Sequence, residues 1–346
     1  MDKINLKNDY NAVGHPLILK ALEAELDHKF VGYGTDEICA RAKDLLLSKI
    51  DKPQAAVHFL VGGTPVNLIS LSAFLRPHEA IIAPDNGHIN VHETGSIEAT
   101  GHKIVTVPGE DGKISAASVQ ALCDLHSDEH MVKPKLVFIS QATEIGTIYS
   151  LKELKALREV CDKNQLLLYL DGARLPSALT ASDNDASLKD IAALTDAFYL
   201  GGTKNGLLFG EALVIVNPAL QSEFRYLMKQ RGGMLAKGFL LGIQFLRYLQ
   251  DDLFMEIAQA ANKQADRLRE GLKVVGVEMV TTTSTNQIFP IFEDKIVERL
   301  KEVALFELWG KVSDHETAIR FVTSWLTTDQ EIERLLMAIM KAYDKK

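Results

Sequence analysis

Short apolar runs alternate with amphipathic stretches through the first two-thirds of the chain. The runs are four to six residues long and rich in Val, Ile, Leu and aromatic residues. This pattern is typical of strands that are buried on both faces of a sheet. We therefore expect strands at Val57–Val61, Ala80–Ala83, Lys103–Val107, Lys135–Ser140, Leu166–Leu170, Ala197–Leu200 and Ala212–Val216.

Helical patterns lie between several of these runs. The clearest begins after Ser150, which forms a capping box with Glu153. Its apolar face carries Leu151, Leu154, Leu157 and Val160. Strands that alternate with helices predict βαβ units and therefore an α/β fold with a mostly parallel sheet.

The pattern changes from about Leu235 onward. Apolar residues recur at helical spacing from Phe239 to Ile257, which predicts a long helix towards Leu268 that bridges two domains. A last helix begins at the capping box Thr328…Glu331. Between the two helices we expect apolar strands at Val274–Val280, Ile288–Phe292 and Ala318–Ser324, and a helix near Asp294–Leu305. The predicted organisation is an N-terminal arm at 1–15, a large domain at 16–245 and a small α+β C-terminal domain at 246–346.

The amino-acid composition limits the classes of binding partner and the cellular compartment that we expect. The 346 residues include 38 Lys and Arg against 46 Asp and Glu, a net charge of -8, which argues against nucleic acid or an anionic membrane as the main partner. Three cysteines without a CxxC motif argue against a disulfide framework or a thiolate metal site and favour a reducing compartment. No signal-peptide pattern and no apolar run of ~18 residues is present, so we expect a cytoplasmic protein.

Four predicted strands run directly into polar or glycine-rich residues. In open α/β sheets, ligands bind beyond the carboxyl ends of the strands, so these residues are expected to meet at one sheet edge. The segments are Gly62-Gly63-Thr64, Pro84-Asp85-Asn86-Gly87-His88, Asp171-Gly172-Ala173-Arg174 and Gly201-Gly202-Thr203-Lys204.

The first of these segments, Gly62-Gly63-Thr64, precedes a predicted helix. Glycines allow close backbone approach, the helix N-terminus offers free N–H groups, and Thr64 adds a hydroxyl, so the turn can hold a phosphate. Glycine can equally be present for steric reasons alone. The next residues, Pro65, Val66 and Asn67, exclude a GxGxxG fingerprint and a Walker A loop.

Lys204 and Asp171 each follow an apolar strand. A partly desolvated lysine can form a Schiff base with a carbonyl, although a lysine at a strand end can also simply extend its amine into solvent. A carboxylate at the end of a buried strand needs a cation or several hydrogen bonds. A structural pair between Asp171 and Arg174 is one such arrangement.

His88, His92 and Glu93 invite a zinc interpretation, because the two histidines are four positions apart. An HExxH motif would need a histidine where Ser96 stands, and no third ligand lies nearby, so we expect no metal site. An imidazole that covers the face of a flat cofactor suits His88 better.

In their order and spacing, these motifs resemble the pyridoxal-phosphate (PLP) enzymes of fold type I, and most closely the low-specificity L-threonine aldolases of the β-eliminating lyase group. The resemblance covers nearly the whole chain. It rests on Asn8-Asp9, Gly32-Tyr33-Gly34, Gly62–Thr64 with Asn67, His88 with Glu93, Asp171–Arg174, Lys204 and the run from Ala318 to Thr323.

The resemblance implies a catalytic set of Lys204, His88 and Asp171. Lys204 would bind the cofactor aldehyde as a Schiff base, Asp171 would pair with the pyridine nitrogen, and His88 would stack on the ring. Arg174 would approach the phenolic oxygen of the cofactor or the substrate carboxylate. The residues implied for the phosphate are Gly63, Thr64 and Thr203.

For the substrate, the resemblance implies that Arg320 clamps the carboxylate, with contributions from Asn8, Tyr33 and Arg174. It also implies a homodimer or homotetramer with active sites at the dimer interface. Two basic side chains, Arg231 and Lys237, would then serve the neighbouring subunit's phosphate.

The implied activity is retro-aldol cleavage of β-hydroxy-α-amino acids, such as L-threonine or L-allo-threonine, to glycine and an aldehyde. The family carries a histidine in an Asn-Thr-His run, and here Thr143, within Gln141-Ala142-Thr143-Glu144, takes its place. The base for the β-hydroxyl proton therefore stays open among His88, Glu144 and water. Alternative functions are another PLP β-eliminating lyase, a phenylserine-type aldolase, or a binding protein without catalysis; a nucleotide-dependent dehydrogenase is disfavoured by the missing fingerprint.

Overall fold

The computed structural model describes residues 2–343, and a seven-stranded sheet forms its centre. All seven predicted strands are present, and β8 runs antiparallel between β2 and β7 whereas the other neighbours are parallel. The expected α/β class with a mostly parallel sheet is confirmed. In spatial order the strands are β2 (Ala56–Leu60), β8 (Glu211–Ile215), β7 (Ala197–Gly201), β6 (Leu167–Asp171), β5 (Lys133–Ser140), β3 (Glu79–Pro84) and β4 (Lys103–Val107).

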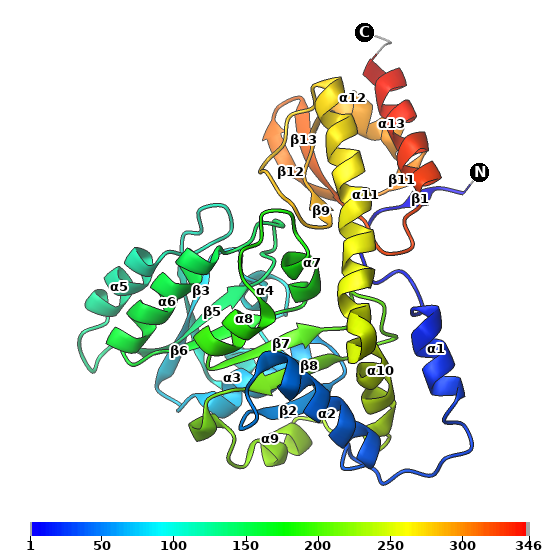
Figure 1. The fold of residues 1–346 in the computed structure, drawn as a ribbon. Coiled ribbons are helices and arrows are strands. Elements are labelled where there is room, and N and C mark those ends of the chain that lie inside the picture. Colours follow the sequence, from blue (N-terminus) through cyan, green and yellow to red (C-terminus); the bar gives the residue numbers. More distant parts are fainter. Residues whose placement is uncertain (1, 344–346) are drawn as a thin grey trace.

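Helices cover both faces of this sheet (Figure 1). Alternate residues of β6 enter opposite cores: Leu168 and Leu170 pack in one, Leu167 and Tyr169 in the other. This two-sided burial explains why the strands read as continuous apolar runs. One core is closed by α2 (Glu37–Ile50), α5 (Ala116–Leu125), α6 (Leu151–Lys163), α8 (Leu188–Leu194) and α10 (Phe239–Leu249), and the other by α3 (Gly63–Phe74), α4 (His88–Val91) and α9 (Phe224–Gln230).

A smaller region with its own core lies above the sheet in Figure 1. The N-terminal strand β1 (Ile4–Asn5) pairs with β11 (Ala304–Leu305), so the arm of the chain reaches into this region. Its remaining elements are β9 (Gln287–Ile288), β10 (Ile291–Glu293), α12 (Asp294–Leu300), β12 (Glu307–Ser313), β13 (Glu316–Val322) and α13 (Asp329–Tyr343). The domain limits at residues 15 and 245 remain predictions.

The bridging helix is interrupted, unlike the single long helix that we predicted. Asp251 and Asp252 adopt positive φ angles of 53° and separate α10 from α11 (Leu253–Val275) at the short turn η3 (Gln250–Asp252). The first turns of α11 pack against the large core, through Leu253 and Ile257. Its later turns pack in the small core through Leu268 and Leu272, so α11 joins the two regions.

Three other expectations for the C-terminal part were wrong. The run Val274–Val280 is not a strand, because α11 extends to Val275 and Gly276 ends it with a φ of 81°. Pro290 separates β9 from β10 within the run expected as one strand, and α12 stops at Leu300. Strand β12 was missed, since most of its residues are exposed.

The remaining described elements are short connections, of which α7 is largely buried. No helix within residues 2–343 combines the length and apolar character that crossing a membrane demands. These connecting elements are α1 (Pro16–Glu23), α7 (Leu175–Leu179), η1 (Glu98–Thr100) and η2 (Pro218–Leu220).

Candidate active site

A cavity of about 810 Å³ lies at the carboxyl ends of the parallel strands. The loops after β3, β5, β6 and β7 supply its floor, as expected for an open α/β sheet. The N-terminal arm contributes Tyr10 to the lining, and residues of the small region complete it. The titratable and aromatic residues lining it are Asp85, His88, His92, Glu144, Asp171, Arg174, Lys204, Glu307, Trp309 and Arg320.

Asp171 is the last residue of β6 and is 4% exposed. Because side chains alternate along a strand, it points to the face of Tyr169, towards α3. Its carboxylate accepts hydrogen bonds from Asn67 Nδ2 (3.0 Å), the Tyr199 hydroxyl (2.5 Å) and the Ala173 N–H (3.0 Å). Three donors satisfy this buried carboxylate and hold it in one orientation.

His88 begins α4, immediately after β3, and its Nδ1 lies 2.8 Å from Glu93 Oε1. Asn67 links this pair to Asp171, since its Nδ2 also donates to Glu93 at 2.8 Å. Burial opposes the charged imidazole, but its hydrogen bond to Glu93 and the charge of Asp171 outweigh this effect and raise the pKa of His88 above 6.5.

The same three groups, His88, Glu93 and Asp171, each offer one ligand atom within 4.8 Å of the others. A divalent cation there would have to displace the direct His88–Glu93 contact and the donors to Asp171. The cluster is therefore a satisfied hydrogen-bond network, and we assign no metal to it.

Lys204 lies in the loop that follows β7, and its amine lines the cavity. Burial and the nearby Arg174 charge lower the pKa of Lys204, which favours the neutral, nucleophilic amine. The backbone of this loop is held by Glu211, which accepts hydrogen bonds from the Gly202 N–H (2.9 Å) and the Thr203 hydroxyl. Burial raises the pKa of Glu211 to about 7.

Arg174 pairs with Asp9 of the N-terminal arm, not with Asp171. Its Nε and one terminal nitrogen donate to the two Asp9 oxygens at 2.7 and 3.0 Å. The side chains are 11% and 2% exposed, so this bidentate pair is largely desolvated. The alternative of an Asp171–Arg174 structural pair is therefore wrong.

Arg320, on β13, lines the opposite wall of the cavity. Its guanidinium lies 5.4 Å from the ring centre of Trp309, and its contact with Glu307 is long, at 3.9 Å. Its Nε is buried without a hydrogen-bond partner in the described part of the chain. An unpaired planar donor facing a cavity is suited to a ligand carboxylate.

The glycine turn before α3 lies beside the cavity without lining it. Helix α3 begins at Gly63, and neither a side-chain cap on its N-terminus nor a partner for the Thr64 hydroxyl occurs within residues 2–343. A Cβ atom on Gly63 would lie 2.9 Å from the Tyr199 hydroxyl that holds Asp171. Thr203 does not line the cavity either, and its hydroxyl accepts the Gly210 N–H.

Several residues implied by the resemblance lie outside this cavity. Asn8 accepts a hydrogen bond from the Tyr10 N–H, while its neighbours Asp9 and Tyr10 approach the site. Tyr33 is 46% exposed, with Lys229 Nζ 4.5 Å from its ring centre. Two basic side chains expected to serve a neighbouring subunit, Arg231 and Lys237, are also exposed and do not line the cavity.

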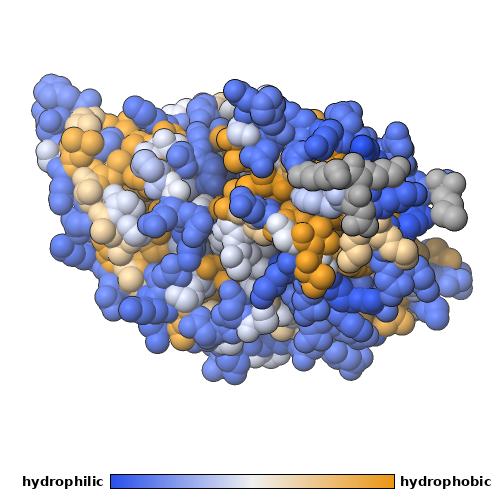
Figure 2. All heavy atoms as spheres, turned by 90° about the horizontal axis from the view of Figure 1, so that it is seen from above, coloured by the Kyte–Doolittle hydropathy of each residue, from blue (hydrophilic) through white to orange (hydrophobic). Residues whose placement is uncertain are grey.

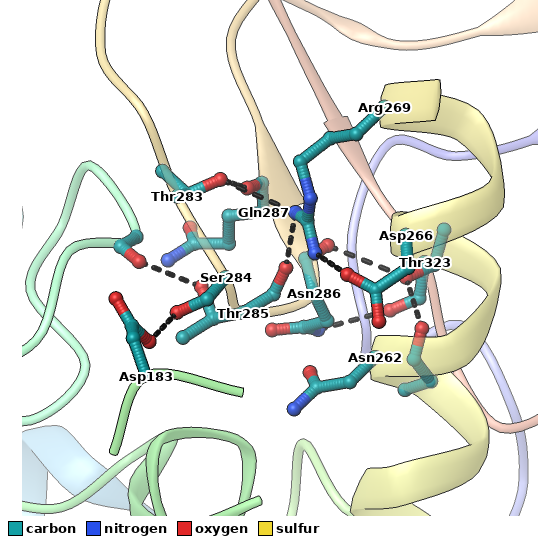
Figure 3. Close-up of polar contacts among 12 residues, drawn as sticks. Asp183, Asn262, Asp266, Arg269, Thr283, Ser284, Thr285, Asn286, Gln287 and Thr323 are labelled. Carbon is teal, nitrogen blue, oxygen red and sulfur yellow. Dashed lines mark hydrogen bonds and ion pairs between the residues drawn. The ribbon is translucent and has the colours of Figure 1, made fainter. Parts of the chain in front are cut away.

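A polar layer lies between the sheet region and the small region (Figure 3), and one of its residues contacts the arm. Asn286 is its central residue: its Nδ2 donates to Asp9 Oδ2 (3.0 Å) and to the Thr323 carbonyl (2.9 Å), and its Oδ1 accepts from Ser177. Nearby, Arg269 of α11 donates to the Thr285 carbonyl at 2.7 Å. The geometry connects Arg174, through Asp9, to elements of both regions.

Sequence reasoning gave no role to Tyr199, Glu211, Trp309 or Asn286. Two of them carried a usable signal, because Tyr199 and Glu211 are polar side chains inside buried strands, where each needs a partner. The other two depend on contacts between segments far apart in the sequence.

The comparisons with known proteins agree with this geometry. A family model described as beta-eliminating lyase matches residues 11–295. The low specificity L-threonine aldolase of Pseudomonas aeruginosa is 32% identical, over 88% of this chain and 86% of its own. The solved structure of a Leishmania major threonine aldolase is 44% identical with a TM-score of 0.96, covering 98% of this chain and 99% of that one.

A more distant likeness concerns the fold alone. An aspartate aminotransferase from Thermus thermophilus is 14% identical with a TM-score of 0.72, covering 99% of this chain and 92% of that one. Together with the threonine aldolase structure, it confirms the expected fold type I architecture. The extent of the family match and the identity to the curated relative agree, and the chain belongs to the β-eliminating lyase family.

Proposed function

We propose that this protein is a PLP-dependent carbon–carbon lyase that cleaves β-hydroxy-α-amino acids such as L-threonine to glycine and an aldehyde. The observation that carries the proposal is the position of Lys204 and Asp171 on one wall of a cavity whose other wall holds Arg320, with an Nε that has no hydrogen-bond partner in the described chain. The threonine aldolase names of the relatives support the same activity.

The residues present fit the cofactor. Lys204 offers an amine for its aldehyde, the held carboxylate of Asp171 suits a protonated pyridine nitrogen, and the His88 imidazole suits a ring face. The uncapped N-terminus of α3 and the free Thr64 hydroxyl suit a phosphate. When bound, PLP accepts electron density from the bonds at the substrate α-carbon.

The substrate carboxylate is assigned to Arg320, whose Nε lacks a partner, with Arg174 as the second cation. Two points of attachment, the substrate amine at the bound cofactor and the carboxylate at Arg320, would fix the rotation about the substrate α-carbon. This rotation decides which α-carbon bond lies in line with the cofactor's electron system and breaks.

The lowered pKa of Lys204 suits both the first and the last step of the reaction. A neutral amine can exchange with the substrate amine, and afterwards it can carry a proton to the α-carbon to complete glycine. Besides burial, the positive charge of Arg174 disfavours a second cation at Lys204.

Incubation with L-threonine and with phenylserine tests the proposal. Glycine plus an aldehyde supports the aldolase, whereas ammonia plus a keto acid would indicate a β-eliminating lyase of another kind. A protein that binds PLP and releases neither product pair would be a binding protein. A buried lysine amine argues against that alternative, since desolvating it is costly without a chemical use.

We also infer that two or four copies assemble, with the active sites at the subunit interface. Large apolar side chains are exposed near the N-terminus, at Val13 (75%), Leu26 (79%) and Val31 (67%), and the face seen in Figure 2 likewise shows hydrophobic patches among hydrophilic residues. The exposed Arg231 and Lys237 would then reach the neighbouring cofactor phosphate. Sedimentation analysis tests the assembly.

A cytoplasmic location is a further part of the proposal. All three cysteines, Cys39, Cys123 and Cys161, have free thiols, which supports a reducing compartment. Cell fractionation tests this location directly.

A further inference from the structure

Cleavage of the bond between Cα and Cβ needs a group that takes the proton of the β-hydroxyl. This question rests on the proposed aldolase function, since a lyase of another kind would not need this base. The cavity offers two histidines and four carboxylates that could accept a proton: His88, His92, Asp85, Glu144, Asp171 and Glu307.

Glu144 borders the cavity, but its carboxylate is engaged within the protein. Its Oε1 accepts the His88 N–H (3.1 Å) and the Ser140 hydroxyl (2.9 Å). Its Oε2 has no accessible surface and no partner within the described chain. Burial and the charge of Asp171 raise the pKa of Glu144, which favours the protonated acid, so this group holds the start of α4 in place.

The two groups that would contact the cofactor ring are also engaged in hydrogen bonds. His88 is bound through Nδ1 to Glu93, and its raised pKa favours imidazolium, which has no free lone pair. Asp171 already accepts three hydrogen bonds. Neither is free to take a proton from a hydroxyl group.

His92 is different, because it lines the cavity and its ring makes no hydrogen bond with any residue of the described chain. It follows His88 by one turn of α4, its N–H donates to the His88 carbonyl (2.9 Å), and the two ring centres are 5.6 Å apart. Arg320 and Glu307 approach from the small region. The ring thus lines the same cavity as His88 and the arginine assigned to the carboxylate.

We propose that His92 is the catalytic base that accepts the β-hydroxyl proton. The proton moves from the hydroxyl oxygen to a ring nitrogen, and the O–H electron pair becomes the second bond of the aldehyde C=O. The Cα–Cβ bond breaks, and its electron pair stays at Cα with the bound cofactor. A proton then returns to Cα to give glycine, so the balance needs no further reactant.

The charged groups around His92 favour this role. Burial, His88 on its own helix, Arg320 on β13 and Lys204 after β7 lower its pKa, while Glu307 on β12 opposes them. The ring is therefore neutral at neutral pH and has a free lone pair. General base catalysis needs a base that is already deprotonated, and the lowered pKa keeps His92 in that state.

The test compares His92→Gln with the wild-type holoenzyme. We expect kcat for threonine cleavage to fall about 10²–10⁴-fold, the usual contribution of a positioned base. The visible absorbance of bound PLP and the exchange of the glycine α-proton with deuterated water should change less than about threefold, because neither uses the hydroxyl proton. The low-pH limb of the kcat profile should disappear.

Two control variants keep the result specific. His130→Gln removes an exposed histidine outside the cavity and should match the wild type. Glu144→Gln should retain the low-pH limb, even if its rate falls because His88 is less well held.

Three outcomes would overturn the inference. His92→Gln could keep the wild-type pH profile, or it could lose cleavage and glycine exchange equally. In the third, the low-pH limb of the kcat profile is lost in Glu144→Gln instead of in His92→Gln. An unchanged cleavage rate in His92→Gln would assign the proton to water. A wild-type protein that binds PLP and exchanges glycine without cleaving threonine would instead refute the proposed function itself.

Discussion

Asp9 holds the guanidinium of Arg174 through two hydrogen bonds of 2.7 and 3.0 Å, across 165 positions of the sequence. The pair ties the N-terminal arm to the loop after β6, where it borders the cavity. Because both side chains are nearly buried, each needs the other to be ionised.

Replacing Asp9 by Asn should therefore destabilise the protein strongly. It leaves a buried arginine without its counter-charge, and breaking such a pair costs roughly 3–5 kcal/mol. Urea unfolding of the holoenzyme measures this cost, and Asp183→Asn, at an exposed side chain, serves as the control. A loss below about 1 kcal/mol, the range of surface ion pairs, would contradict the account.

The same pair predicts how stability depends on acid. Burial opposes ionisation of Asp9, but Arg174 and Lys204 outweigh it and lower the folded-state pKa below 3.8. The stabilisation is thus complete above 3.8 and is lost as the pH falls through the lower folded value. In thermal melts, the difference between wild type and Asp9→Asn should shrink in that acidic range; a constant difference would contradict this assignment.

Asn286 should be important for stability through its three partners. Its replacement by Ala removes one donor from Asp9, which keeps its two bonds from Arg174, and takes the side-chain donor away from the Thr323 carbonyl. Leaving a buried group unsatisfied costs about 1–3 kcal/mol. Ser284→Ala, on the same segment but with an exposed bond to Asp183, should cost less than about 0.5 kcal/mol. Equal losses in the two variants would mean that Asn286 has no special place in the layer shown in Figure 3.

Tyr199 should affect the reaction more than it affects stability. Tyr199→Phe removes the 2.5 Å donor to Asp171, and a hydrogen bond to a charged group is worth about 1.5–3 kcal/mol, so kcat should fall about tenfold or more. The matched control is Tyr149→Phe, which removes a buried hydroxyl that accepts the Ile114 N–H outside the cavity. If the two variants have the same kcat, the Asp171 network does not support the cofactor.

Arg320→Lys tests the carboxylate site. A lysine keeps the charge but loses the planar fork, so KM for threonine should rise about 10–100-fold with little change in the absorbance of bound PLP. Arg267→Lys, in an ion pair with Glu333 on the exposed face of α11, is the control and should leave KM unchanged. An unchanged KM in Arg320→Lys would remove Arg320 from the substrate site.

The central sheet was predictable because its inner strands are buried on both faces and therefore read as continuous apolar runs. The C-terminal part was harder to predict, because β12 contains few apolar residues and most of its residues are exposed. The break at Asp251 and Asp252 depends on two positive φ angles, which the helical spacing of the neighbouring apolar residues concealed.

The active site likewise contains residues that the sequence predicts and residues that it does not. Strand ends identified Asp171, Arg174 and Lys204, because the carboxyl ends of parallel strands meet at one edge. Their partners could not be read from the sequence, since Asn67 is 104 positions from Asp171. The arm likewise contributes Asp9 and Tyr10, next to the expected Asn8, because pairing of β1 with β11 sets its path.

The most direct measurement of the central claim is the visible absorbance of the purified protein after addition of PLP and removal of the excess. The wild type should show a yellow band, keep it through dialysis and lose it in Lys204→Ala. Lys263→Ala, at an exposed site on α11, should keep the band. A wild-type protein that stays colourless, or a Lys204→Ala variant with an undiminished band, would contradict the assignment of Lys204 as the residue that binds the cofactor.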